Sequence, residues 1–251
     1  MMILIGALSA CQLKWLFFSS GSFLIRFLKK GYKPLLIAAF WLYCIDNVDT
    51  ILLFLPRIST FADLRWNWQG KILEFSLALL IIYGFKGLTP RQTGLRLPKN
   101  NWAFIYAMLL GIMYVAGIVK FAIANGYPLP IHPSIETLFF QATMPGLAEE
   151  ALYRGVYLAV LNNYLGRAWS VLTVKFGWGL VLVTLLFVLG HVVHYDRTAQ
   201  QIVYNFELID LVQLSILGLT LAIIREKSES IWPAVVFHNI CNVGVYLYVL
   251  A

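Results

Sequence analysis

The sequence predicts an all-α membrane protein, a polytopic bundle of about eight transmembrane helices around a buried polar cavity. Of the 251 residues, 60% are hydrophobic and only 12% are charged, whereas soluble domains carry about 25% charged residues. The apolar residues form stretches close to the ~20 residues that a membrane-spanning helix needs. Three short polar clusters interrupt the later stretches, and ionisable groups within a membrane are costly unless they pair or face a wet cavity.

Eight apolar stretches are predicted to span the membrane, and together they use most of the chain. They are residues 3–19, 34–55, 72–87, 102–123, 137–162, 169–193, 208–225 and 231–250. Since little sequence remains between them, we expect residues 1–251 to form one integral membrane domain. The first stretch lacks the basic region and the A-x-A site of a signal peptide, so we interpret it as a membrane or interfacial helix. The segment 195–207 is predicted to lie at the membrane interface.

The net charge of +7 comes from basic residues that are spread over short loops. Membrane topology explains this distribution better than nucleic-acid binding does, so no nucleic-acid partner is expected. The segments 26–33 and 86–99 each carry four basic residues and no acidic residue, and both are therefore predicted to face the cytoplasm. Eight spans would then place both termini outside. The loop 57–71 disagrees mildly, with three basic residues against Asp63.

The cysteines lie in apolar stretches and show no C-x-x-C spacing. They are Cys11, Cys44 and Cys241. This pattern is typical of packed free thiols rather than of a disulfide or a metal site.

A separate polar group lies in the second predicted span, at Asp46, Asn47 and Asp49. Ionisable residues within a span can mark an ion path, so a transporter is one possible function. The same residues are also compatible with a helix break or with the lining of the polar cavity. No paired inverted repeat accompanies them, and transport therefore ranks last among the functions considered.

The first of the three polar clusters lies in the middle of the predicted span 137–162. Glu150 and Arg154 are i,i+4 neighbours and can form an ion pair on one helix face, whereas Glu149 points about 100° away. Two adjacent carboxylates repel each other in a low dielectric. We therefore interpret Glu150 and Arg154 as a structural lock and Glu149 as the group left for chemistry. The alternative, a salt bridge at the membrane surface, is disfavoured by the central position of Glu149.

A helix break is predicted just before this cluster, at Pro145 and Gly146. Proline removes the helical hydrogen bond to the carbonyl of Gln141. Irregular backbone is tolerated inside a membrane only where it faces protein or a cavity. We therefore expect the break to open room for water beside Glu149.

The second cluster is Phe187 with His191, four residues later on the same helical face. A histidine near the end of a span is ordinarily an interfacial side chain, and His194 is predicted to be one. His191 gains importance only in combination with the other clusters.

The third cluster is His238 with Asn242, an i,i+4 pair on an otherwise apolar helix. An imidazole N–H and an amide NH₂ are both hydrogen-bond donors. Two converging donors suit the oxyanion that forms when an amide carbonyl becomes tetrahedral. The alternative is a polar clasp between two helices, which is common in membranes.

These three motifs, Glu-Glu-x-x-x-Arg, Phe-x-x-x-His and His-x-x-x-Asn, resemble in this order the CPBP (CAAX protease and bacteriocin-processing) family of intramembrane glutamic proteases, which is related to the Rce1-type CAAX prenyl endopeptidases. The resemblance covers about residues 146–248, so the helices of 137–250 are interpreted as the catalytic part. Residues 1–130 carry no signature. The resemblance implies an endopeptidase that hydrolyses a peptide bond of a membrane-associated, lipidated or secreted peptide.

The resemblance also implies roles for individual residues. Glu149 would activate water, His191 would help to hold that water, and His238 with Asn242 would form the oxyanion site. The supporting residues would be Glu150, Arg154 and Phe187. No cofactor is expected, because the chain has no H-E-x-x-H pair and because Asn242 suits hydrogen-bond donation better than metal ligation. The alternative is a zinc site with Glu149, His191 and His238 as ligands.

Other intramembrane protease chemistries are excluded, since the sequence contains neither a GxSG nor a GxGD motif. The main alternative from another class is a non-catalytic membrane protein, such as an immunity or scaffold factor with the same fold. As a protease, the chain would be a multi-pass protein of a bacterial or archaeal cell membrane, with the lipid bilayer and a peptide as its partners. Prenylated CAAX tails, bacteriocin or pheromone leaders and C-terminal sorting helices all remain possible substrates.

Overall fold

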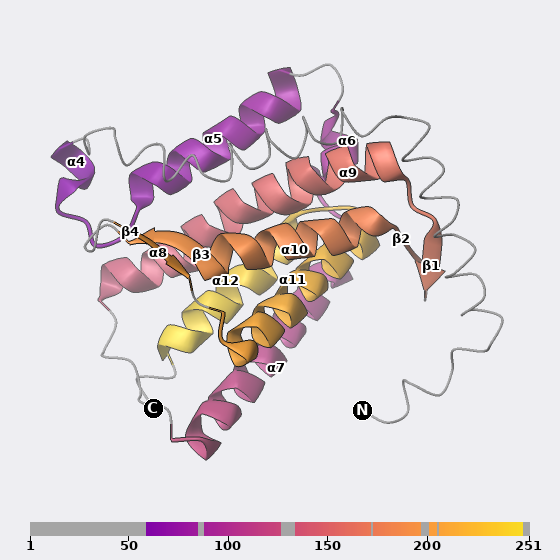
Figure 1. The fold of residues 1–251 in the computed structure, drawn as a ribbon. Coiled ribbons are helices and arrows are strands. Elements are labelled where there is room, and N and C mark those ends of the chain that lie inside the picture. The colour runs from indigo at the N-terminus through magenta and orange to yellow at the C-terminus, as the bar shows by residue number, and fades with distance from the viewer. Residues whose placement is uncertain are drawn as a thin grey trace.

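The computed structural model describes residues 59–84, 88–126, 134–171, 173–196, 201–204 and 206–247. Within these ranges the chain is mostly helical (Figure 1). The helices are α4 (Ser59–Ala62), α5 (Trp68–Gly84), α6 (Pro90–Thr93), α7 (Trp102–Ala124), α8 (Ile135–Glu149), the π-helix η2 (Glu150–Tyr157), α9 (Leu158–Leu165), α10 (Trp178–Val192), α11 (Leu208–Ser228) and α12 (Trp232–Leu247).

Two short antiparallel hairpins complete the described part. They are β1 (Trp169–Val171) with β2 (Val174–Phe176), and β3 (Val193–Asp196) with β4 (Gln201–Tyr204). Several predictions lie outside the described residues. These are the spans 3–19 and 34–55, the basic segment 26–33, Cys11, Cys44, Asp46, Asn47 and Asp49.

The central element is a continuous rod of α8, η2 and α9, which runs from left to right in Figure 1. It begins at Ser134, whose hydroxyl accepts a hydrogen bond from the backbone N–H of Thr137 at 3.1 Å, as an N-cap does. It ends at Gly166, whose φ is 75°. Every residue of η2 is buried, and the rod packs against α5, α10 and α12. It corresponds closely to the predicted span 137–162.

The predicted helix break at Pro145 is wrong, because α8 continues through this residue to Glu149. A side chain from α12 supplies the reason. The backbone N–H of Gly146 donates to Oδ1 of Asn239 at 2.9 Å, and Nδ2 of Asn239 donates to the carbonyl of Thr143 at 3.3 Å. Backbone groups beside the proline thus have a partner on α12. The irregular backbone lies instead in the π-helix that follows.

The predicted span 169–193 is wrong in its first part, because residues 169–176 form the hairpin β1–β2 and the helix α10 starts only at Trp178. Two glycines explain the difference. Gly166 ends α9 with a positive φ, and a Cβ on Gly177 would overlap the carbonyl of Gly166. This close approach of backbone to backbone turns the chain, and only glycine permits it. The predicted interfacial segment 195–207 also contains a strand, β4, which pairs with β3.

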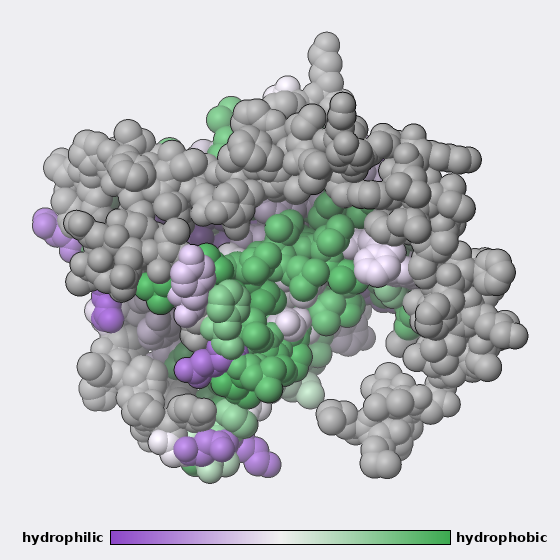
Figure 2. Space-filling model, in the orientation of Figure 1, coloured by the Kyte–Doolittle hydropathy of each residue, from purple (hydrophilic) through white to green (hydrophobic). Residues whose placement is uncertain are grey.

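Two of the described helices, α7 and α11, are long and apolar enough to cross a membrane, and α10 is a shorter apolar helix. α7 buries only Ala107 and Gly111, so most of its apolar side chains are exposed. On the face seen in Figure 2, apolar side chains also gather over the centre, where α10 and α11 lie in Figure 1. A mostly helical membrane fold agrees with these features, and the number of eight spans stays a prediction.

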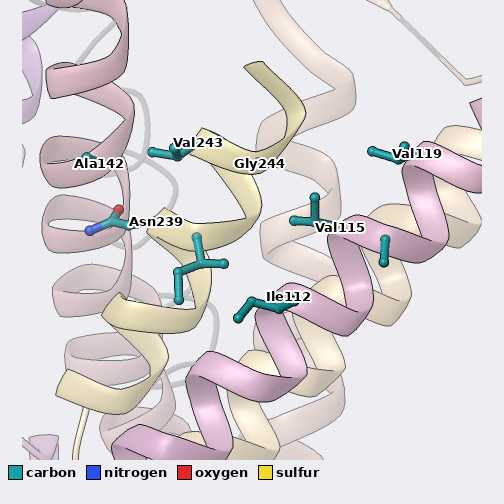
Figure 3. A pocket seen from close by; sticks show the side chains of 9 residues that line it. Ile112, Val115, Val119, Ala142, Asn239, Val243 and Gly244 are labelled. Carbon is teal, nitrogen blue, oxygen red and sulfur yellow. The ribbon is translucent and has the colours of Figure 1, made fainter. Parts of the chain in front are cut away.

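An apolar groove of about 520 Å³ lies between α7, α8 and α12. Figure 3 shows Asn239 at its edge, with the side chain directed to the helix that carries Ala142. On α12, the helix that carries Asn239, Cys241 is buried and is a free thiol. The prediction of a packed free thiol is therefore confirmed for this cysteine.

Candidate active site

A buried carboxylate, Glu150, forms the rigid centre of the site. Its Oε1 accepts a hydrogen bond from Nη1 of Arg154 at 3.0 Å and lies 2.8 Å from Nδ1 of His238. The side chains of Glu150 and Arg154 are both fully buried. An ionised carboxylate only accepts hydrogen bonds, so Nδ1 of His238 carries the proton. Glu150 therefore pairs with Arg154, as its spacing predicts, and also orients an imidazole from α12, which the sequence did not indicate.

Arg154 is held by two further contacts from neighbouring helices. Its Nη2 donates to the carbonyl of Gly218 on α11 at 3.1 Å, and its guanidinium lies 4.4 Å from the ring centroid of Phe187 on α10. A cation over a buried aromatic ring is stabilised by the ring quadrupole. Glycine at position 218 suits this close packing, since a Cβ there would lie only 3.2 Å from the side chains of Phe187 and Thr184.

Glu149, one residue earlier, points to a different set of partners. Its Oε2 is 3.6 Å from Nε2 of His191 and 3.9 Å from Nε2 of His238. Both distances are too long for a hydrogen bond, and this buried oxygen has no hydrogen-bond partner in the described part of the chain. The other oxygen, Oε1, is 3.1 Å from the ammonium nitrogen of Lys71.

His191 reaches Glu149 from the end of α10. Its Nδ1 is 2.8 Å from the carbonyl oxygen of Phe187, which can only accept, so Nδ1 is protonated and Nε2 faces the carboxylate. Exposure falls from His191, at 33% of its side chain, to Glu149 at 11% and His238 at 2%. The site is therefore reached from the C-terminal end of α10.

The charges around the two glutamates nearly balance. Glu149, Glu150 and Glu74 bring three carboxylates, and Lys71 and Arg154 bring two cations. Buried charges need compensation.

The π-helix η2 begins directly after Glu149 and carries both Glu150 and Arg154. A π-helix has a wider turn than an α-helix, and such segments are common at functional sites. Here the carbonyl of Arg154 accepts a hydrogen bond from Nε of Arg225 on α11 at 3.2 Å. The irregular turn is thus stabilised by a buried side chain from another helix.

Asn242 lies near the other site residues along α12 but makes no direct bond to them among the described residues. It is half-buried on α12, one turn after His238 and on the same helical face. Among the described residues, no hydrogen bond links it to another member of the site. The structure thus brings six of the seven predicted residues into mutual contact. They are Glu149, Glu150, Arg154, Phe187, His191 and His238. His194 lies apart from them, on β3.

Sequence reasoning missed Lys71 and Glu74, which α5 contributes to the site. The interpretation of Lys71 as a loop charge in 57–71 is wrong, because this residue lies in the first turns of α5. Its ammonium also pairs with Glu74 at 2.7 Å. The signal was present in the sequence, since a Lys and a Glu at i,i+3 stand at the start of an otherwise apolar run. Asn239 was missed as well, although it adjoins His238.

The alternative zinc site fits the structure poorly. Among the described residues, no group of three or more His, Cys, Asp or Glu side chains has an arrangement suited to a metal ion. Glu149 already faces the ammonium of Lys71 at 3.1 Å, and a divalent cation beside it would be repelled. Catalysis without a metal stays a prediction.

The fold and the site together define a class, a helical membrane protein with a buried carboxylate between two imidazoles. Residues 132–244 match the family described as Type II CAAX prenyl endopeptidase Rce1-like. This match confirms the resemblance seen in the three motifs. The Rce1-like family consists of membrane-embedded proteases. Comparison with curated proteins and with solved structures found no match.

Proposed function

We propose that the protein is an intramembrane endopeptidase in which Glu149 activates water to hydrolyse a peptide bond of a membrane-associated substrate. One observation carries the proposal. Oε2 of Glu149 is buried, lacks a hydrogen-bond partner in the described residues, and faces Nε2 of both His191 and His238. The family match over residues 132–244 supports proteolysis as the reaction.

In the proposed mechanism, a water molecule lies between Oε2 of Glu149 and Nε2 of His191, a separation that suits a bridging water better than a direct bond. Glu149 accepts one proton from this water, and the oxygen attacks the carbonyl carbon of the peptide. The C=O π electrons move to oxygen and give a tetrahedral oxyanion. Glu149 then passes its proton to the amide nitrogen, the C–N bond breaks, and a carboxyl group and an amine are released.

His238 is the proposed donor to the oxyanion. Because its Nδ1 proton is engaged by Glu150 at 2.8 Å, Nε2 can donate only when the ring is an imidazolium. The ring of His238 lies between the carboxylates of Glu149 and Glu150. Asn242 is proposed as the second donor, one helical turn away.

We further propose that catalysis needs no metal and that the protein acts as a multi-pass protein in a cell membrane. The family description names CAAX prenyl endopeptidases, so a prenylated C-terminal tail is one candidate substrate. Leader peptides and C-terminal sorting helices are the other candidate substrates.

The test uses purified protein in liposomes with three labelled peptides: a farnesylated C-terminal tail, a secreted-peptide leader and a sorting helix. Glu149→Gln should abolish cleavage of the accepted peptide while the protein stays folded. Glu149→Asp should retain little activity, because its shorter side chain misplaces the water. The matched control is Glu207→Gln, which changes an exposed carboxylate at the start of α11.

Unchanged cleavage by folded Glu149→Gln would refute the glutamate mechanism. If no peptide is cut by the wild-type protein but the catalytic residues prove important for stability alone, a scaffold function would be supported instead.

A further inference from the structure

Lys71 places a cation against the proposed base from a helix outside the family-matched segment 132–244. Its Nζ is 3.1 Å from Oε1 of Glu149 and 2.7 Å from Oε2 of Glu74. The side chain of Lys71 is 17% exposed, and that of Glu74 is 8% exposed. These groups are therefore largely removed from water. An ion pair between largely buried groups is screened much less than one at the surface.

The start of α5 is fixed to the start of α8 by specific contacts. The carboxylate of Glu136 accepts hydrogen bonds from the backbone N–H of Trp66 at 3.3 Å and from Nε1 of Trp68 at 3.1 Å. Nε1 of Trp66 also donates to Oγ1 of Thr137 at 3.0 Å, and its ring stacks on Phe140 at 5.3 Å. Because these contacts hold the starts of the two helices together, the fold itself places the side chain of Lys71 beside Glu149.

We propose that Lys71 is part of the catalytic centre, where its ammonium holds Oε1 of Glu149 and so leaves Oε2 as the oxygen that takes the proton from water. The proposal rests on the proposed function of Glu149. Glu74 acts as a positioning residue that holds the ammonium in place.

Two physical effects support this assignment. First, a carboxylate bound on one oxygen keeps a fixed rotamer, so the second oxygen stays directed at His191 and His238. Second, without Lys71 the site would contain three carboxylates and only one guanidinium. Repulsion would then favour uptake of a proton by Glu149 before the reaction, and a protonated carboxyl group cannot accept one from water.

The kinetic test compares Lys71→Met, Lys71→Arg and Glu74→Gln in liposomes with the accepted peptide. Lys71→Met keeps the length of the side chain but removes its charge, and we expect kcat to fall by at least about 10²-fold with KM changed less than about 3-fold. Lys71→Arg should recover activity to within about 10-fold of wild type, because the charge remains. Glu74→Gln should lie between the two. Lys120→Met, at an exposed position of α7, is the matched control and should be neutral.

A second readout does not depend on activity. Lys71→Met and Glu149→Gln should each lower the melting temperature, and the double variant should lose less than the sum, because an ion pair couples the two residues. Additive losses would overturn the proposal. So would a folded Lys71→Met variant with wild-type kcat while Glu149→Gln is inactive, a result that leaves the proposed function intact. An active Glu149→Gln would refute the proposed function instead, and a Lys71→Arg variant as slow as Lys71→Met would show that charge is not the cause.

Discussion

Substitution of Gly146 by alanine tests whether α8 and α12 must touch one helical turn before Glu149. A Cβ at residue 146 would lie 2.8 Å from Cγ of Asn239 and 2.9 Å from the carbonyl oxygen of Val235. The side chain of Asn239 can rotate away, but the Val235 carbonyl belongs to the backbone of α12. We therefore expect the two helices to separate at this point.

The magnitude follows from three contributions. Ordinary carbon–oxygen contacts are about 3.3–3.6 Å, so the helices must move apart by roughly 0.5 Å, and overpacking of this kind costs about 1–3 kcal/mol. Loss of the hydrogen bond from Gly146 to Asn239 costs about 1 kcal/mol more. The better helix propensity of alanine offsets about 1 kcal/mol. A net destabilisation of about 1–3 kcal/mol is expected, together with reduced cleavage because Glu149 lies one turn further along.

The assay is reversible denaturation in mixed micelles, with cleavage measured per folded molecule. Two glycine variants provide matched controls. Gly117→Ala on α7 meets no atom within 4 Å, and Gly155→Ala in η2 meets its nearest atoms at 3.7 Å. Both should be neutral or stabilising, because neither substitution is blocked and alanine favours helix.

The reasoning would be refuted by a Gly146→Ala variant as stable as Gly117→Ala. In that case α12 can shift without cost, and the clamp by Asn239 is not what holds α8 together at Pro145. A stable variant with lost activity would place the effect on the geometry of Glu149 instead.

Three further predictions address the chemistry and the surface. Asn242→Ala should lower kcat by about 10²–10³-fold with little change in KM, measured by cleavage in liposomes; an early melting curve with full turnover per folded molecule would make the residue structural. Exhaustive chelation should leave activity unchanged, and elemental analysis should find far less than stoichiometric zinc; activity that only zinc restores would establish a metalloprotease. A hydrogen bond from Lys99 lowers the pKa of Glu229 below its ordinary value of 4.5, and the charge of Arg96 adds to the effect. Glu229 therefore stabilises the fold above pH 4.5 and loses this contribution as the pH falls through the lowered pKa. Glu229→Gln should melt earlier than wild type at pH 7, and the difference should disappear in acid; a difference independent of pH would contradict the ion pair.

Contacts within one helix were open to prediction from the sequence. The i,i+4 spacing of Glu150 and Arg154 gives the observed ion pair, and the same spacing of Phe187 and His191 gives the observed contact. Helix geometry is local, so neighbours at these spacings meet whatever surrounds them. The apolar stretches 102–123 and 208–225 likewise predicted α7 and α11 to within a few residues.

Features that depend on two distant segments were missed or wrong. Composition favoured a helix over 169–176, but the close packing of Gly177 on Gly166 produces a hairpin. The rule for proline predicted a break at Pro145, but an amide from α12 satisfies the backbone there. In each case a long-range contact outweighs the local preference.

The sequence by itself determined the class of protein, the family resemblance of residues 132–244 and most of the polar residues that make up the site. Only the tertiary structure decided that Glu150 holds His238, that Asn239 clamps α8, and that Lys71 pairs with Glu149. The physical reason lies in the composition of the helices. A helix that is apolar on all sides shows no preferred face, so its sequence does not reveal which neighbour it meets or which distant side chain reaches the site.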